Sequence, residues 1–273
     1  MKNIIGRFRI FSVPTSPTVA LTATATEEEV EGIKENVGLR GNTVVLRASP
    51  ILNHIKYVKV RRPPNHCGGD GWTDQAGDFH PGLLALLDRI YLGKYVENLR
   101  LGVAVKKGII FCRTELHLLM VYEYLLEMLP QFRDPHTMPF VMNHSGTGKA
   151  TCKSFKERKD DISLYVTTSK MLMGVNLSNI QVVVFVRPLN MLHYVVQGGG
   201  RGGRKEISGK RSKVVVYILY NPADTAGNVP GLSADVREFC STGDCLKNFL
   251  RKYFDNEDKV LKSDWCCNIC DSV

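Results

Sequence analysis

The sequence of 273 residues lacks any run of 18 uninterrupted apolar residues, the length that a membrane-spanning helix needs. Its first residues also lack a long apolar segment followed by a small-residue cleavage site, so no secretory signal is expected. Acidic residues are the minority charge, since 27 Asp and Glu stand against 36 Lys and Arg, a net charge of +9. We therefore expect a soluble intracellular protein with a polyanionic partner, most commonly nucleic acid. Charge by itself does not distinguish DNA, RNA and an acidic membrane.

A nucleotide-cradling P-loop is also missing. The segment HSGTGKAT, residues 144–151, contains Gly-Lys, but a P-loop requires Gly, four residues, and then Gly-Lys-Ser/Thr. Asn143 occupies the first of these positions and Ala150 follows Lys149, so the pattern fails twice and we expect a surface turn. No Asp-Glu-x-Asp or Asp-Glu-x-His tetrapeptide occurs either. ATP hydrolysis by this chain alone is not expected, because nothing would hold the β- and γ-phosphates and the metal ion.

What the sequence does contain is an alternation of short β-branched runs with helical segments. Several runs are continuously apolar, which is typical of strands buried on both faces. Leucines recur at intervals of three and four residues in 80–99 and 115–129, which predicts helices there, while 61–78 reads as an exposed loop. The alternation predicts an α/β fold with a mainly parallel sheet, whose strands are expected at 18–24, 55–60, 108–112, 139–143, 163–168, 181–186 and 213–219.

The stretch QGGGRGGR, residues 197–204, places Arg201 and Arg204 three residues apart among glycines. Guanidinium groups suit phosphate oxygens because they are planar, permanently charged and able to donate in a fork. The glycines cost backbone entropy, roughly 1 kcal/mol each relative to Ala in a helix, which favours a functional reason for them. The simplest alternative is a flexible Gly/Arg loop that coats RNA without specificity.

Further polar residues follow the predicted strands. Ligands of open parallel sheets bind outside the carboxyl ends of the strands. We expect the two arginines of QGGGRGGR to share this edge with the residues after three other strands and to form a phosphate-binding surface. For any one of them, an ordinary polar loop residue is the alternative. These residues are Arg113, Thr114, His144, Ser145 and Thr168.

Cysteine is unevenly distributed along the chain. Of eight cysteines, five lie between Cys240 and Cys270. In an intracellular protein such clustering favours zinc over disulfides. Cys267 and Cys270 are separated by two residues, so both thiolates can reach one tetrahedral ion. Buried or unpaired thiols are the alternative.

Taken in order, these motifs resemble those of the RecQ-type DNA helicases of superfamily 2. The cysteine segments CLKNFLRKYFD (245–255) and CCNICD (266–271) are similar to that family's zinc-binding subdomain. The remaining matches are VALTATAT (19–26) with motif III, SPILNHIKYVKV (49–60) with the entry to the second domain, GIIFCRT (108–114) with motif IV, NHSGT (143–147) with a Tyr-His-Ala-Gly turn, VTTSKMLMGVNLSNIQVVV (166–184) with motif V, QGGGRGGR with motif VI, and YNPAD (220–224) with a strand exit.

The resemblance implies three parts. Residues 1–48 would be a remnant of the first RecA-like domain, 49–228 a second RecA-like helicase C-terminal domain of α/β type, and 229–273 a small helical zinc-binding subdomain. It also implies an ATP-dependent DNA helicase with 3′-to-5′ polarity. Such an enzyme unwinds single-strand/duplex junctions in repair, recombination or replication, and its expected location is the nucleus, away from membranes.

Site residues follow from the same resemblance. Three residues of motif VI would face ATP and Mg²⁺ held by a first RecA-like domain in cis: Gln197, Arg201 and Arg204. The nucleotide would also meet Gly174, Asn176 and Gly200, and DNA would meet Thr24, Arg113, Thr114, His144, Ser145 and Thr168. Zinc would be held by Cys240, Cys245, Cys267 and Cys270, with Cys266 as the alternative to Cys240, because the family's third clustered cysteine falls on Val273.

The chain departs from the family pattern in motif V, where residues 170–174 keep only the Met-Gly end of the usual Ala-Phe-Gly-Met-Gly. The sequence also starts just before motif III. We expect a truncated gene product that lacks the first RecA-like domain. The alternative is a degenerate, catalytically inactive module that binds nucleic acid or a partner and retains the helicase C-terminal fold.

Overall fold

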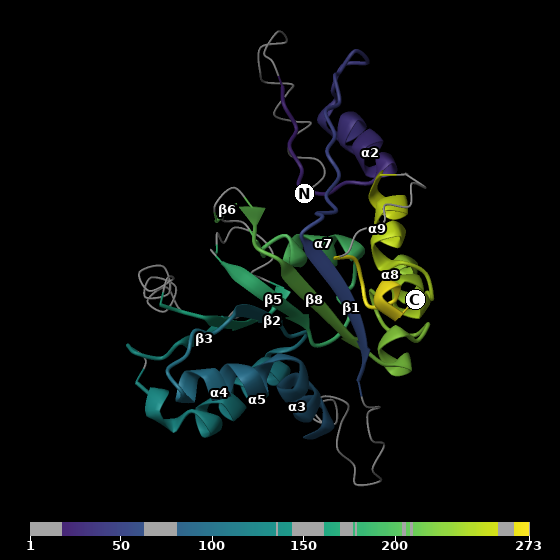
Figure 1. Ribbon diagram of the computed structural model, residues 1–273. Coiled ribbons are helices and arrows are strands. Elements are labelled where there is room, and N and C mark those ends of the chain that lie inside the picture. The colour runs from purple at the N-terminus through teal and green to yellow at the C-terminus, as the bar shows by residue number, and fades with distance from the viewer. Residues whose placement is uncertain are drawn as a thin grey trace.

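The computed structural model describes residues 18–62, 81–134, 136–143, 161–169, 177, 179–203, 206–207, 210–255 and 265–272. Within them, six parallel strands form one sheet in the order β1-β8-β5-β2-β4-β3 (Figure 1). The predicted α/β fold with a parallel sheet is confirmed. The strands are β1 Ile55–Arg61, β2 Lys107–Phe111, β3 Phe140–Asn143, β4 Leu164–Thr167, β5 Ile180–Phe185 and β8 Val214–Tyr220.

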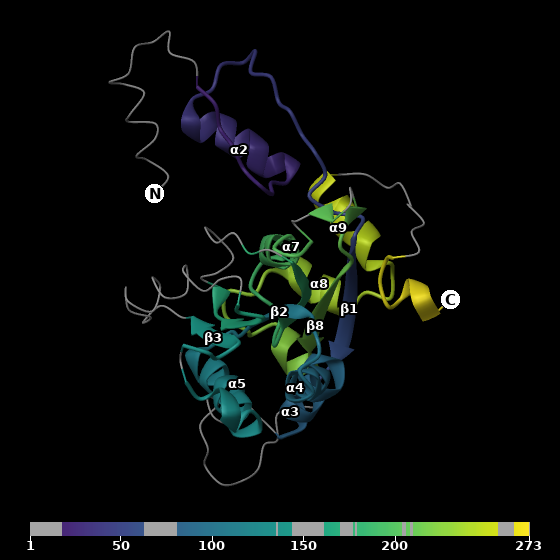
Figure 2. The ribbon, with the colours of Figure 1, turned by 60° about the vertical axis from the view of Figure 1, so that its left-hand side comes forward.

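Side chains that alternate along each strand divide the interior into two cores. On β2, Ile109 and Phe111 enter one core, whereas Ile110 and the following Cys112 enter the other. All four are fully buried, which explains why the strands read as continuous apolar runs. The first core lies under α7, α8 and α9, and the second under α3, α4 and α5 (Figures 1 and 2).

The predicted helices at 80–99 and 115–129 are present. The first is continuous from Pro81 to Arg100, with a π-helical stretch at Asp88–Leu92 between α3 (Pro81–Leu87) and α4 (Gly93–Arg100). Thr114 caps the second, α5 (Glu115–Met128), by accepting a hydrogen bond from the His117 amide. The other helices of the sheet layers are α7 Leu192–Gly199, α8 Ala234–Ser241 and α9 Leu246–Asp255.

Short elements complete the described chain. Three of them are 3₁₀ turns and two form an antiparallel hairpin between α7 and β8. None of the described helices combines the length and apolarity needed to cross a bilayer. The elements are η2 Pro130–Phe132, β6 Glu206–Ile207, β7 Lys210–Arg211, η4 Pro222–Thr225 and η5 Cys270–Ser272.

The segment before the sheet differs from its prediction. Residues 18–24 form no strand, because no described strand lies beside them to complete a ladder. They lead instead into α2 (Glu27–Val37), which a Thr26/Glu29 capping box begins and Gly38, with φ 64°, ends. No residue of α2 is buried, and α2 lies beyond the end of α9 in both views (Figures 1 and 2).

Candidate functional site

The QGGGRGGR segment lies at the amino-terminal edge of the sheet. The Gly203 amide donates to the Ile180 carbonyl at the start of β5 (3.0 Å), and Gly202 packs on Val214 at the start of β8. The expectation that Arg201 shares the carboxyl edge with the other polar residues is therefore wrong. Because β5 and β8 are parallel, the chain that leaves β5 at its carboxyl end must return through α7 to the opposite edge before it enters β8.

Close packing explains two of the glycines in this segment. A Cβ atom on Gly202 would lie 2.6 Å from a Val214 methyl group. A Cβ atom on Gly203 would lie 2.6 Å from the His54 ring, and Gly203 has φ +62°, which L side chains rarely adopt. The segment is thus fitted closely against β8 and His54, unlike the flexible Gly/Arg loop that is the simplest alternative from the sequence.

The same helix end contacts the segment before the sheet. Gln197 donates from Nε2 to Thr24 Oγ1 at 2.9 Å, and His193 Nε2 lies 2.7 Å from Glu29 Oε2. Gly200 is the C-cap of α7, and the half-buried Arg201 follows it. Of the residues predicted to meet nucleotide, Arg204, Gly174 and Asn176 lie outside the described residues.

Two neighbouring strands carry the predicted nucleic-acid residues at the carboxyl edge. Arg113 and Thr114 follow β2 and Thr168 follows β4, and β2 pairs directly with β4. Thr114 also has a structural role as the cap of α5. The structure therefore brings these three residues to one edge, while Thr24 lies at the other end of the sheet against Gln197. His144 and Ser145 lie outside the described residues.

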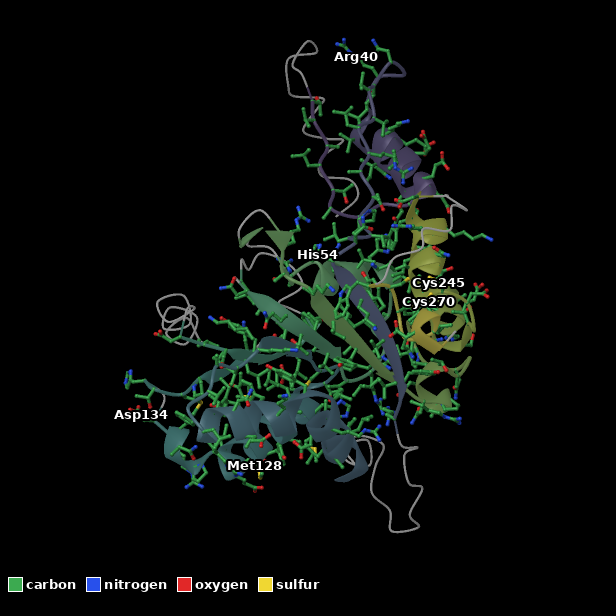
Figure 3. The ribbon with its side chains drawn as sticks, in the orientation of Figure 1. Arg40, His54, Met128, Asp134, Cys245 and Cys270 are labelled. Carbon is green, nitrogen blue, oxygen red and sulfur yellow. The ribbon has the colours of Figure 1, made fainter. Side chains whose placement is uncertain are left out.

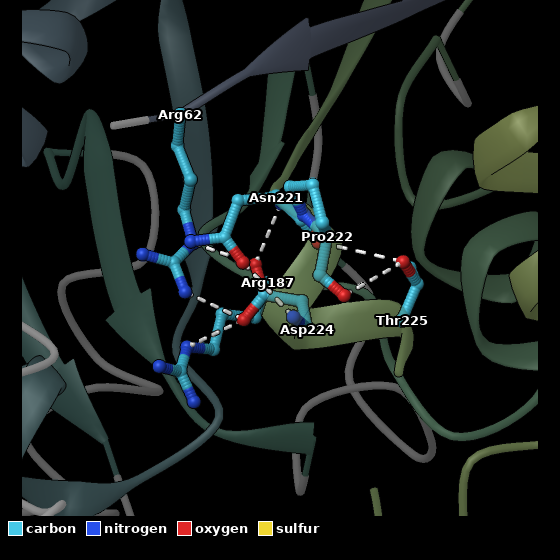
Figure 4. A network of polar contacts seen from close by, with 6 residues as sticks. All are labelled: Arg62, Arg187, Asn221, Pro222, Asp224 and Thr225. Carbon is cyan, nitrogen blue, oxygen red and sulfur yellow. Dashed lines mark hydrogen bonds and ion pairs between the residues drawn. The ribbon is translucent and has the colours of Figure 1, made fainter. Parts of the chain in front are cut away.

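A buried charge network at the carboxyl edge was not anticipated from the sequence. Arg62, after β1, donates from Nε and NH2 to the two oxygens of Asp224, each at 2.6 Å, and Arg187, after β5, approaches Asp224 at 3.1 Å (Figure 4). Arg62 and Asp224 are each 3% exposed. Asn221 and Asp224 also form the reciprocal capping box of η4, so YNPAD, residues 220–224, signals the turn that holds Asp224 but does not indicate its partner Arg62.

The charges of this network also change the pKa of His117 in α5. Burial and the nearby guanidinium groups of Arg187 and Arg62 together lower its pKa to about 4, against the opposing carboxylate of Asp224. The imidazole is therefore neutral at physiological pH. The low pKa of His117 indicates a positive potential here, because a single carboxylate, Asp224, pairs with two guanidinium groups.

Four cysteines come together beside β1: Cys245, Cys266, Cys267 and Cys270. Their sulfur atoms all lie within 4.8 Å of one another, with Cys245 and Cys266 3.3 Å apart and Cys267 and Cys270 3.5 Å apart. A tetrahedral zinc ion with Zn–S bonds of about 2.3 Å places its sulfurs about 3.8 Å apart, so this donor set fits zinc. Figure 3 shows Cys245 and Cys270 next to each other below α9.

Cys240 is not a member of this group, which corrects the choice of Cys240 over Cys266 as the fourth cysteine. It lies in α8 within the first core, at 1% exposure, and burial raises its pKa to about 12. Cys266 takes its place because its backbone pairs with β1, where the Tyr57 amide donates to the Cys266 carbonyl.

Backbone groups around Cys267 favour a thiolate. Burial alone would raise the pKa of Cys267, but hydrogen bonds from the backbone of Cys270, Leu246 and Ile269 lower it below its usual value. Amides that converge on the first sulfur of a Cys-x-x-Cys turn prepare it to bind a metal cation. The site would hold zinc through four sulfurs and supply a structural crosslink between α9 and β1.

No protein-family model and no curated protein matches the chain. Among solved structures, Dbp5 of S. cerevisiae bound to RNA and ADP BeF3 superposes with a TM-score of 0.56 at 13% identity, covering 94% of this chain and 53% of that one. The helicase Lhr of Mycobacterium smegmatis, bound to ssDNA and AMP-PNP, gives 0.51 at 16% identity, covering 75% and 24%. The chain has a RecA-like helicase-domain fold. It spans about half the length of Dbp5 and a quarter of Lhr.

Proposed function

We propose that the chain is the second half of the motor of an ATP-dependent DNA helicase of RecQ type. Residues 49–228 would be its second RecA-like domain, 229–273 its zinc-binding subdomain and 1–48 the remnant of the first RecA-like domain. The RecA-like fold supports the motor, and the order of motifs in the sequence supports the RecQ type, the DNA substrate and the 3′-to-5′ polarity. A nuclear location follows from that activity.

One contact carries the proposal. Thr24 and Gln197 belong to segments that resemble motif III and motif VI, and they are 173 positions apart in the chain, yet they form a hydrogen bond of 2.9 Å. Arg47 adds one further link from the same segment by donating to the Phe254 carbonyl of α9, and it also donates to the Ala25 carbonyl within the segment. A segment proposed to belong to a first domain thus docks directly on the helix that leads to Arg201.

The proposed mechanism uses the amino-terminal edge for nucleotide. Gln197, Gly200 and Arg201, with Arg204, Gly174 and Asn176, would approach ATP–Mg²⁺ held by a first RecA-like domain. A guanidinium group there stabilises the negative charge that spreads over the γ-phosphoryl oxygens during transfer. It contributes only when the two domains close, because this chain has no P-loop of its own.

The carboxyl-terminal edge would carry the DNA strand. Arg113, Thr114 and Thr168 there supply one guanidinium group and two hydroxyls, groups that bind phosphates without reading sequence. His144 and Ser145 are proposed to join them. Opening and closing of the nucleotide cleft would then move one RecA-like domain along the strand relative to the other.

The cysteine group is proposed to bind zinc through Cys245, Cys266, Cys267 and Cys270. Zinc in such a closed site of four thiolates stabilises structure and performs no chemistry on substrate. Its place between α9 and β1 makes it a clamp that holds the C-terminal segment, including Trp265, against the sheet.

The decisive experiment joins this chain to a matching first RecA-like domain and measures DNA-stimulated ATPase activity. Arg201→Ala should lower kcat by about 10³-fold or more, as expected for loss of a charge-stabilising arginine. Arg133 is an exposed arginine that directly follows η2, and Arg133→Ala is the matched control that should leave the rate unchanged. Unchanged activity in Arg201→Ala overturns the proposal. A joined protein that binds DNA without any stimulated ATPase would favour the catalytically inactive module.

A further inference from the structure

A groove lies at the amino-terminal edge of the sheet, between the cysteine group and the Gly/Arg segment. Its volume is about 580 Å³, within the usual range of about 300–1,000 Å³ for small-ligand sites. His54, labelled in Figure 3, connects it to the Gly/Arg segment because Gly203 packs on the His54 ring. The groove is lined by Ile51, Leu52, Asn53, His54, Arg211, Lys213 and Trp265.

Trp265 provides this groove with a fixed aromatic surface. Its Nε1–H donates to the Val214 carbonyl at 3.1 Å, which anchors the indole on the first residue of β8. Two ammonium groups lie over the ring, Lys213 at 4.7 Å and Lys56 at 5.2 Å from its centroid. An aromatic ring with cations at its face is the combination that binds single-stranded nucleic acid, because bases stack on the ring while the cations meet phosphates.

The charges around the groove are mostly positive. Lys213 and Arg211 are exposed, and Arg211 stands opposite Glu206 in the β6–β7 hairpin. Lys56 pairs with Asp271, so it contributes less to the positive potential of the groove. Beneath the groove, Lys247 of α9 is 2% exposed and donates to the carbonyls of Asn53 and Trp265, while Arg251 donates to the Asn53 side chain at 3.2 Å. These buried cations fix the groove floor and add positive potential to it.

We propose that this groove binds single-stranded nucleic acid, with one base stacked on Trp265 and the neighbouring phosphates on Lys213 and Arg211. The ammonium group of Lys213 would move from the ring to a phosphate as the base arrives. A duplex fits less well, because each of its bases is stacked between neighbouring bases and leaves no free face for the indole. The inference rests on the proposed function only in taking nucleic acid as the ligand, and it adds a second strand-binding site at the edge opposite Arg113 and Thr168.

The experiment uses the fluorescence of Trp265. The chain has two tryptophans, and Trp72, which lies outside the described residues, is removed as Trp72→Phe so that Trp265 is the single reporter. Titration with oligo(dT) at about 50 mM salt should quench this fluorescence. Lys213→Glu in the same background should weaken binding about tenfold, and the slope of log K against log salt should fall by about 0.7. Lys94→Glu, which reverses an exposed charge on α4, should change neither the affinity for oligo(dT) nor the salt slope.

Further ligands separate this proposal from general attraction of polyanions. An abasic deoxyribose-phosphate oligomer should bind with little quenching, and Trp265→Phe should retain oligo(dT) binding, measured by anisotropy of a labelled strand. Equal quenching by poly-glutamate, or unchanged affinity in Lys213→Glu, overturns the proposal. Loss of ATPase in Arg201→Ala with no effect of Lys213→Glu on oligo(dT) binding would retain the proposed function and reject this groove.

Discussion

The two edges of the six-stranded sheet hold their basic residues in different ways. At the carboxyl edge, Arg62 and Arg187 share the buried carboxylate of Asp224. At the amino edge, Arg211 and Lys213 are exposed beside Trp265, and no ion pair involving either is found among the described side chains. A buried guanidinium–carboxylate pair holds strands in place, whereas exposed cations next to an aromatic ring are available to a ligand.

This comparison separates residues that fold the domain from residues that act for it. Arg62 is almost completely buried, so it cannot reach a phosphate, even though it stands at the edge where ligands of parallel sheets bind. Two glycines at the amino edge also serve the fold. Gly202 and Gly203 allow the backbone to pack closely against β8 and His54. Position at a sheet edge is therefore insufficient, and burial decides which arginines can bind.

The largest expected effect concerns the cysteine group beside β1. Cys266→Ser should abolish stoichiometric zinc, because apparent binding free energies of structural zinc sites, about 10–16 kcal/mol, depend on all four ligands. Metal content by mass spectrometry under native conditions measures it. Cys240→Ala is the control and should keep one zinc per chain, since Cys240 lies outside the group. Zinc that survives in Cys266→Ser but not in Cys240→Ala would restore Cys240 as the ligand.

The second largest effect is expected from removing the carboxylate of the buried charge network at the carboxyl edge. Asp224→Ala leaves the buried Arg62 without its carboxylate and should lower the free energy of unfolding by about 3–5 kcal/mol. Urea denaturation followed by circular dichroism measures the change. Glu97→Gln removes an exposed carboxylate from α4 and should change stability by less than about 0.5 kcal/mol. Equal stability of the two variants would mean that the network contributes nothing to folding.

The charge at the carboxyl edge also predicts a pH dependence. The pKa of His117 is lowered to about 4 in the folded protein, so the unfolded chain binds the proton first as pH falls below about 6.5. His117 should therefore reduce stability by up to about 3 kcal/mol between about pH 6.5 and pH 4, and cost nothing above that range. His117→Leu should flatten this part of the pH profile, whereas His136→Leu, at an exposed position, should leave it steep.

The smallest expected effect tests the contact that links the amino edge to the N-terminal segment. A double-mutant cycle of Thr24→Val and Gln197→Ala should give a coupling of about 1 kcal/mol, typical of one neutral hydrogen bond. Thr43→Val combined with Gln197→Ala is the reference and should be additive, because the Thr43 hydroxyl bonds to the Arg40 carbonyl. Additivity in both cycles would show that the contact is not made in solution.

Much of the fold could be predicted from the sequence because local patterns determined it. Six of seven expected strands are present, since β-branched runs of strand length are read without knowledge of their neighbours. The exception, residues 18–24, has the same composition but no partner strand within the described chain. Helix α2 was missed although its capping box, Thr26 and Glu29, is visible in the sequence.

The site was harder to predict because it depends on contacts that are distant in the chain. Arg201 was placed on the wrong edge, since the sequence alone does not display the return path of α7. The pairing of Arg62 with Asp224 joins residues 162 positions apart, and neither stands in a pattern that requires the other. Cys266 was identified as a possible ligand, but the sequence did not decide between it and Cys240; the structure does, because Cys266 bonds to β1 through the Tyr57 amide and lies with the other three cysteines.

The parallel strands that separate the two edges have a mechanical consequence. A strand of six residues such as β5 spans about 20 Å at a rise of about 3.3 Å per residue, and its hydrogen-bonded neighbours make it rigid. The sheet can therefore act as a lever between the Gly/Arg edge and the Arg113 edge. In the proposed motor, a rotation of about 10° about one edge would displace the other by about 3.5 Å, close to the ~3.4 Å rise per nucleotide of each strand in duplex DNA.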